Sequence, residues 1–282
     1  MDARSIAEKL AQGGRFQELT LGETSSGRSR VFRLYTPDGT RVLKVYGSAA
    51  LQRRESHALQ ALGGLEGMPV LLDRHDDVDE PWALFADAGK WNLGSLPENT
   101  GLAKRAGEIL RQVHDSGAKI SNLTRGIDAD WVATDFYSAI RRLQRYRGRL
   151  RLPAEIFTRA NAVPPPTASE PLPSHARNAP KRYVVDDDGT VSLLGWEWAT
   201  LAPPEWDLTR MVWLLGSRVG DRAAGAFQEG YGTELARAEL ERWTVYHVAM
   251  VLLFRADDSS KSGTGADLDH LISEFHRSVA SA

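Results

Sequence analysis

The sequence contains no cysteine, no long apolar segment and almost no net charge. The absence of cysteine excludes disulfides, thiolate metal sites and cysteine nucleophiles, and it is typical of proteins in a reducing compartment. The longest strongly apolar stretch, Val248 to Phe254, is far too short to span a bilayer, and the N-terminal segment lacks the apolar core of a signal peptide. A formal charge of −2 provides no general attraction to nucleic acid or to an anionic membrane. We therefore expect a cytoplasmic protein that binds neither nucleic acid nor membranes.

The composition is that of an ordinary globular protein. The chain has 282 residues, of which 42% are hydrophobic and 26% are charged. This length allows either one large domain or two coupled lobes, and either arrangement can bury a substantial core.

The N-terminal part of the chain, residues 1–88, has the pattern of a small antiparallel sheet with one main helix. The segments VFRLY at 31–35 and RVLKVY at 41–46 flank the turn sequence Pro-Asp-Gly at 37–39, which predicts a hairpin. Apolar residues within 49–62 repeat on one helical face. The later segments PVLLD and PWALFAD predict two further strands.

Residues 89–282 are predicted to form a mainly helical lobe. Apolar side chains repeat at spacings of three and four residues, which predicts helices near 102–113, 136–150, 208–215 and 268–279. The proline-rich segment 162–173 is unsuited to a helix or a central strand. After it, RYVV and TVSLLGWEW flank a turn and predict a hairpin region at about 172–198. This order of elements predicts an α+β, two-lobed fold like that of the protein kinases.

Three features of the sequence resemble the aminoglycoside phosphotransferase family, which has a protein-kinase-like fold. They are Lys44 in VLKVY, Glu55 in the helix that follows, and the segment from Tyr183 to Leu208. The resemblance implies that Lys44 neutralises nucleotide phosphates and that Glu55 holds this lysine in position. Taken singly, the two residues have a plainer interpretation, as a solvated strand lysine and a surface helix glutamate.

The resemblance also implies a hinge and two structural residues. The connector residues Ala86, Asp87 and Ala88 match the hinge whose backbone meets the edge of adenine. His175 matches an anchor of the catalytic loop, and Asp207 matches an aspartate that binds nearby backbone amides. A helix cap would explain Asp207 equally well.

Three positions depart from the family pattern. Members carry the motif H-G-D-x-x-x-x-N, in which the aspartate accepts a proton from the acceptor hydroxyl and the asparagine binds magnesium. Here these two positions are Arg177 and Arg182, and the family's second metal-binding aspartate is replaced by Gly195. A guanidinium group stays protonated, so it serves neither as a base nor as a magnesium ligand. We therefore expect no intact catalytic residue at these degenerate positions.

The replacements suggest a cationic pocket. Arg177, Lys181 and Arg182, approached by Lys44 from the sheet, would concentrate positive charge where the family holds metal and triphosphate. Such a pocket would bind a nucleotide, another anionic small molecule or an acidic peptide without a metal ion.

Two alternatives concern carboxylates near this pocket. Arg177 or Arg182 could instead pair with Glu55, Glu197 or Asp207 and close the cleft, since a buried arginine needs a partner. Glu197 is also the one carboxylate that could replace a lost metal ligand, because it lies two residues beyond Gly195 on the same strand face.

An arginine-rich run occupies residues 140–151. The low net charge and the lack of a nucleic-acid-binding module argue against a nucleic-acid site. The run is then either a solvated helix face, with arginine stems covering apolar surface, or a docking site for an acidic protein or peptide.

Together these features predict a pseudokinase of the phosphotransferase type. We expect it to bind ATP, ADP or another anionic ligand, or a protein or peptide partner, and to scaffold or regulate an active enzyme. The lost metal ligands argue against magnesium dependence. The alternative is an active ATP-dependent small-molecule phosphotransferase, or another kinase-fold enzyme, with relocated metal ligands.

Overall fold

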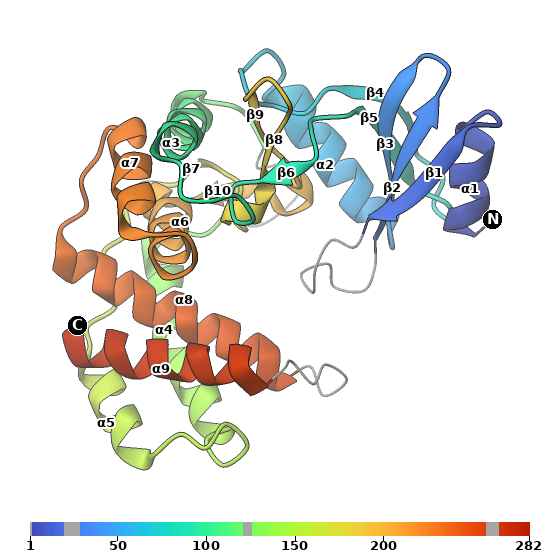
Figure 1. The fold of residues 1–282 in the computed structure, drawn as a ribbon. Coiled ribbons are helices and arrows are strands. Elements are labelled where there is room, and N and C mark those ends of the chain that lie inside the picture. Colours follow the sequence, from blue (N-terminus) through green and yellow to red (C-terminus); the bar gives the residue numbers. More distant parts are fainter. Residues whose placement is uncertain (1, 20–28, 121–125, 258–264) are drawn as a thin grey trace.

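An antiparallel sheet and a helical body form the two lobes of the chain (Figure 1). The computed structural model describes residues 2–19, 29–120, 126–257 and 265–282. Among these residues, no helix combines the length and the apolar character needed to cross a bilayer. The sheet and the helical body together confirm the predicted α+β, two-lobed architecture.

The small lobe is built around five strands in the order β1-β2-β3-β5-β4, all antiparallel to their neighbours. The elements are α1 (Ala3–Leu10), β1 (Arg15–Leu19), β2 (Arg30–Thr36), β3 (Gly39–Val45), α2 (Ala49–Ala61), β4 (Leu71–His75) and β5 (Trp82–Ala86). The predicted hairpin is the β2–β3 pair, in which Thr36 opposes Gly39. Ser48 caps α2 by accepting a hydrogen bond from the amide of Leu51, as N-cap serines do.

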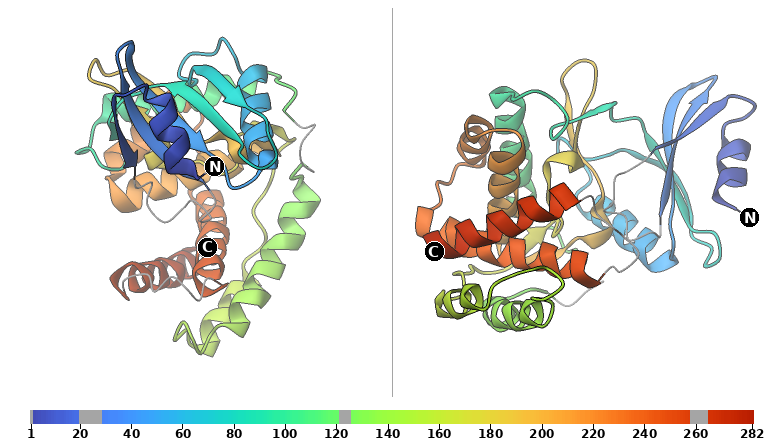
Figure 2. Two further views of the ribbon diagram at one scale, coloured as in Figure 1. Left: turned by 90° about the vertical axis from the view of Figure 1, so that its right-hand side faces the viewer. Right: turned by 60° about the horizontal axis from the view of Figure 1, so that its bottom comes forward.

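Alternation along the strands gives the sheet two different faces. Phe32 and Leu34 of β2, with Leu43 of β3, are buried against α1. The residues that alternate with them, Val31 and Arg33 of β2, face the other way and line the cavity between the lobes. Figure 2 shows α1 on the outer side of the sheet and α2 on the side of the helical lobe. The side chains on this second face, including Lys44 of β3, therefore point into the space between the lobes.

The helical lobe begins with a short strand and contains further short strands among its helices. Its elements are β6 (Trp91–Asn92), α3 (Thr100–Asp115), α4 (Ala129–Arg145), α5 (Ala154–Ala162), β7 (Leu172–Ser174), η2 (Pro180–Arg182), β8 (Tyr183–Val185), β9 (Val191–Leu193), η3 (Trp196–Trp198), β10 (Thr200–Ala202), α6 (Pro204–Arg218), α7 (Asp221–Tyr231), α8 (Arg237–Asp257) and α9 (Gly265–Ser281). The strands β6, β8 and β9 form one small sheet, and β7 pairs with β10.

One predicted helix lies further towards the N-terminus than expected, since α4 begins at Ala129. The apolar spacing predicts a helix near 136–150, but α4 ends at Arg145 and the chain then turns. Leu150 is still buried, because the amides of residues 150 and 152 bond back to the carbonyls of Tyr146 and Arg147 and return the turn to the core. Helical spacing therefore continues through a segment that is not helical.

Candidate functional site

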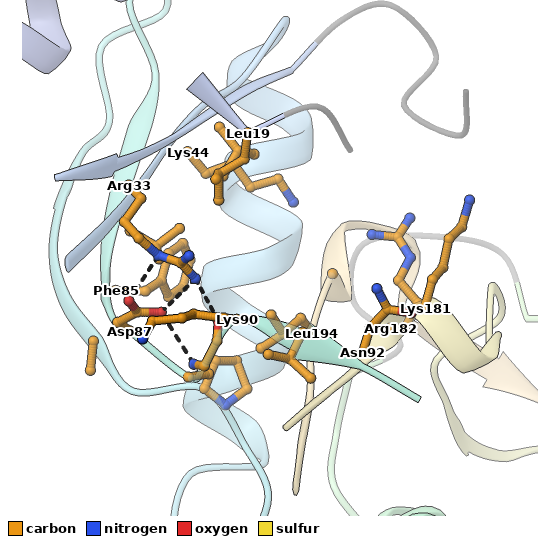
Figure 3. A pocket seen from close by; sticks show the side chains of 18 of the residues that line it. Leu19, Arg33, Lys44, Phe85, Asp87, Lys90, Asn92, Lys181, Arg182 and Leu194 are labelled. Atoms are coloured by element: carbon orange, nitrogen blue, oxygen red, sulfur yellow. Dashed lines mark hydrogen bonds and ion pairs between the residues drawn. The ribbon is translucent and has the colours of Figure 1, made fainter. Parts of the chain in front are cut away.

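A cavity of about 370 Å³ lies between the sheet and the η2–β9 region (Figure 3). Its apolar wall includes Leu19, Val31, Val42, Phe85 and Leu194. Its polar lining includes Lys44, Glu55, Lys181 and Arg182. The predicted hinge residues Ala86, Asp87 and Ala88 also line the cavity, as does Gly195. The alternative expected Arg182 to pair with Glu197, and this ion pair is present at 3.7 Å, but it does not close the cleft, because the cavity remains beside it.

Lys44 lies at the inner end of this cavity and contacts two carboxylates. Its Nζ is 2.5 Å from Glu55 Oε2 and 2.9 Å from Glu197 Oε2. The three side chains are only 10%, 4% and 11% exposed. Burial alone would lower the pKa of Lys44, but the carboxylates of Glu197 and Glu55 outweigh it and raise that pKa. Lys44 is therefore permanently charged and already neutralised by protein groups.

Glu55 and its neighbour Arg54 join α2 to the helical lobe. Glu55 accepts hydrogen bonds from the Tyr46 hydroxyl at 2.7 Å and from the backbone amide of Trp196 at 3.0 Å. Arg54 Nη1 donates to the backbone carbonyl of Glu197 at 3.2 Å. The helix that carries Glu55 is consequently fixed to the η3 segment by direct contacts across the cleft.

Gly195 and Arg182 share one position in space. Gly195 has φ +88°, and a Cβ built there would lie 2.3 Å from Arg182 Nη1 and 2.9 Å from its Cζ. The Arg182 guanidinium thus fills the space into which a side chain at residue 195 would extend. Two of the three degenerate positions are therefore coupled sterically.

This arrangement does not fit a magnesium ion. Magnesium needs oxygen ligands, and here a guanidinium faces a glycine at the two positions that resemble metal-binding ones. Across the described parts of the chain, no three His, Cys, Asp or Glu side chains are grouped to hold a metal ion.

Glu197 is engaged by cations. Besides its contact with Lys44, its Oε1 lies 3.7 Å from Arg182 Nη2. Burial would raise the pKa of Glu197, but Lys44 and Arg182 lower that pKa to about 2. This carboxylate is an internal counter-ion of Lys44 and Arg182, so a metal ion would have to compete with both cations to use it as a ligand.

Arg177, at the position that resembles the catalytic aspartate, packs on an aromatic ring. Its guanidinium carbon lies 3.7 Å from the centre of the Trp198 ring, and Arg54 lies 5.7 Å from the same centre. Burial and then the nearby Arg182 lower the pKa of Arg177. Arg177 is thus held beside the cavity rather than in its wall, which Lys181 and Arg182 form.

Lys181 is exposed at the entrance of the cavity. Partial removal from water, followed by the charges of Arg182 and Arg218, lowers the pKa of Lys181 to about 8. The positive charges around it favour an anion at this entrance.

The loop that resembles the catalytic loop keeps its shape through Asp207. One oxygen of this buried carboxylate accepts the amides of His175 at 2.6 Å and Ala176 at 3.2 Å. His175 Nε2 lies 3.0 Å from the Leu194 carbonyl, and its Nδ1 accepts the Arg177 amide at 3.3 Å. Burial lowers the pKa of His175 to about 4, so the ring is neutral at pH 7 and both nitrogens are used.

Ala176 shows what this loop demands of its backbone. It stands where the family motif has glycine, and its φ is +63°. This left-handed conformation favours glycine and is uncommon for alanine. The loop therefore holds an alanine in a backbone conformation that glycine adopts at lower cost.

An ion pair that was not predicted from the sequence lies at the connector end of the cavity. Arg33 Nε lies 2.9 Å from Asp87 Oδ2, and Arg33 Nη2 donates to Asp87 Oδ1 at 3.1 Å and to the Gly89 carbonyl at 2.5 Å (Figure 3). The only available signal is that Arg33 is a charged residue on the cleft-facing side of VFRLY.

The arginine-rich run covers the end of α4 and the turn that follows it. The arginines of this run are exposed, while Leu143 and Leu150 on the other side are buried in the core. Arg149 also donates to the Ala256 carbonyl at 2.6 Å. The run is thus a solvent-facing basic surface, and docking of an acidic partner on it stays a prediction.

Comparison with known proteins decides the family. The family model described as the phosphotransferase enzyme family matches residues 20–243, which is well over half of the chain. This chain belongs to that family. The resemblance to aminoglycoside phosphotransferases predicted from Lys44, Glu55 and the segment from Tyr183 to Leu208 is thereby confirmed.

Solved structures of phosphotransferases share the fold. A spectinomycin phosphotransferase with ADP and spectinomycin has a TM-score of 0.66 at 13% identity, covering 100% of this chain and 97% of that one. A thermostable mutant of an aminoglycoside phosphotransferase with ADP and hygromycin B has a TM-score of 0.64 at 15% identity, covering 100% and 99%. Choline kinase from Streptococcus pneumoniae has a TM-score of 0.63 at 15% identity, covering 99% and 97%. No curated protein sequence matches the chain.

At these identities the structural likeness concerns the fold alone. The phosphotransferase fold is common to this chain and to proteins described as antibiotic phosphotransferases and a choline kinase. What this phosphotransferase-family member does depends on its own site residues.

Proposed function

We propose that this chain is a phosphotransferase-family pseudokinase, which binds an anionic ligand in its cleft without a metal ion and does not transfer phosphate. The observation that carries the proposal is the Arg182 guanidinium lying against Gly195, in the space that a metal-binding side chain would need. A fixed internal cation at this point takes over the electrostatic role of the metal.

The charges around the cavity support this function. In the buried cluster, the positive charges of Lys44 and Arg182 are balanced by the negative charges of Glu55 and Glu197. A divalent cation therefore finds no surplus of negative charge to neutralise. Lys181 adds a positive charge at the entrance, so the lining attracts anions.

Among the described residues near the cleft, the carboxylates and the His175 imidazole are engaged and offer no free general base. Arg177 is a cation packed on Trp198, and His175 has both ring nitrogens engaged. Glu197 is paired with Lys44 and Arg182. The loss of a general base alone reduces the rate of a reaction by about 10²–10⁴-fold.

A protein that binds a ligand but catalyses no reaction can act by regulating another protein. We infer that the ligand-bound chain scaffolds or regulates a partner protein, for instance an active enzyme. The exposed arginine run at 141–151 is the surface we assign to an acidic partner.

Calorimetric titration of the purified full-length chain tests the ligand-binding part. We expect pyrophosphate to bind in EDTA, without any metal ion, and we expect no release of phosphate from ATP. ATP turnover that requires magnesium and is abolished by Glu197→Ala would instead establish a relocated metal site. Gain of turnover in Arg177→Asp, Arg182→Asn, Gly195→Asp would show that the scaffold still supports the lost chemistry.

A further inference from the structure

The connector end of the cavity is occupied by a side chain of the sheet. Arg33 lies in the middle of β2, opposite Val42 of β3, which in turn lies opposite Phe85 of β5. Residues in such a row project from the same face of a sheet. The Arg33 side chain extends from this row to Asp87 and to the Gly89 carbonyl at the connector end of the cavity (Figure 3).

The contact between Arg33 and Asp87 is nearly closed to solvent. The two side chains are 11% and 15% exposed, and two nitrogen–oxygen distances, 2.9 Å and 3.1 Å, join them. Asp87 Oδ1 also accepts the Gly89 amide at 3.1 Å. The charged groups are therefore held in place by the connector itself.

This arrangement reduces two things that a purine base needs at a connector. A base needs a free apolar surface for its ring face, and it needs free backbone groups for its polar edge. Here the charged Arg33 side chain lines the cavity together with Val42 and Phe85, and the carbonyl and amide of Gly89, next to the predicted hinge residues 86–88, are both hydrogen-bonded within the protein. A bound base would have to displace a nearly buried ion pair and leave its charges unpaired, which is strongly unfavourable.

The opposite end of the cavity remains accessible. Lys181 is exposed at the entrance, and Arg182 lines the wall next to it. Phosphate and carboxylate groups are the natural partners of such a lysine–arginine pair.

We propose that the Arg33–Asp87 pair is a specificity latch that keeps nucleobases out, so that the cavity selects a short phosphate- or carboxylate-bearing molecule over a nucleoside diphosphate. The inference rests on the proposed anion-binding function and narrows its ligand class. In this proposal Arg33 discriminates against the nucleobase, and the Lys181–Arg182 end of the cavity binds the anionic group.

Titration calorimetry of the full-length chain in EDTA tests the latch, with pyrophosphate and ADP as the two ligands. In the wild type we expect pyrophosphate to bind at least about tenfold more tightly than ADP. Arg33→Leu should strengthen ADP binding at least about tenfold and leave pyrophosphate unchanged. The matched control is Arg41→Leu on the neighbouring strand β3, whose guanidinium lies 3.6 Å from the Asp38 carboxylate outside the cavity lining. This control should change neither affinity.

A wild-type preference for pyrophosphate below about tenfold, or an ADP affinity that Arg33→Leu does not raise, overturns the latch. The second variant, Asp87→Asn, releases Arg33 without removing it and should shift ADP in the same direction, which guards against a fold defect in Arg33→Leu. Failure of the proposed function has a different signature, because it appears as magnesium-dependent turnover or as EDTA-sensitive pyrophosphate binding. Absence of binding by both ligands to the wild type and to Arg33→Leu overturns both proposals.

Discussion

The guanidinium of Arg182 lies where a side chain on Gly195 would begin, 2.3 Å from the ideal Cβ position to Nη1. These two residues are thirteen positions apart and belong to η2 and to the turn before η3. Each replacement at a metal-binding-like position therefore accommodates the other. An aspartate at 195 and an arginine at 182 are sterically incompatible in this backbone.

This incompatibility predicts a non-additive pair of mutations. Gly195→Asp alone should lower the free energy of unfolding by about 1–3 kcal/mol, because it combines a positive φ with a collision against Arg182. Adding Arg182→Asn should recover part of that loss, since the collision disappears. Urea denaturation of the two single variants and the double variant measures a coupling of about 0.5–3 kcal/mol. Strict additivity would show that Arg182 does not occupy this space in solution.

Lys44 is predicted to be a stability residue as well as a cavity residue. Lys44→Met removes the cation between two buried carboxylates, so we expect the free energy of unfolding to fall by about 3–5 kcal/mol. Lys104→Met is the control, because Lys104 pairs with Glu229 on the exposed surface, and it should have no measurable effect. A loss for Lys44→Met as small as that of the control would contradict the buried triad.

His175 predicts a loss of stability in mild acid. Its pKa falls from 6.5 to about 4 on folding, so between these pH values His175 is protonated in the unfolded chain and neutral in the folded one. The stability that the neutral His175 ring contributes is fully present above pH 6.5 and is lost as the pH falls towards 4. This lowers the free energy of unfolding by about 3 kcal/mol at most. His175→Gln removes this titration. The difference between the wild-type and variant pH profiles isolates His175 from His247, whose pKa is also lowered. Parallel profiles would argue against a buried neutral ring.

Lys181 predicts a pH-dependent ligand affinity. Its pKa of about 8 means that it carries a positive charge at pH 7 and loses much of that charge by pH 9. Pyrophosphate binding should therefore weaken between these pH values more in the wild type than in Lys181→Ala. At pH 7 the substitution itself should weaken binding by about tenfold. Equal pH dependence in both proteins would place the anion away from Lys181.

The fold was largely predictable because local signals agree with it. Alternating residues around Pro37-Asp38-Gly39 specify the hairpin, and the two strands then present Lys44 on the cleft side. The spacing of apolar residues likewise specifies α2, α3 and α9. The short strands β7 and β10 escaped prediction, because three-residue strands carry too little periodicity to be recognised.

The contacts within the site were much less predictable. Glu197 contacts Lys44 across 153 positions of sequence, and Arg33 reaches Asp87 across 54. No local pattern encodes such pairs, since they depend on how the two lobes are packed. The sequence placed the cations correctly at the cleft for Lys181 and Arg182, but it could not foresee that Trp198 would hold Arg177 to one side.

The contacts of α2 with η3 brace the two lobes against each other before any ligand arrives. Arg54 and Glu55 reach the backbone of residues 196 and 197, while Lys44 reaches the Glu197 side chain. Ligand binding therefore carries no free-energy cost for drawing the lobes together, and even a molecule of a few atoms can bind measurably. For the same reason ligand binding cannot be read by a partner as a large closure of the molecule. At the cleft itself, the change that ligand binding makes is the charge that the bound anion brings to its entrance.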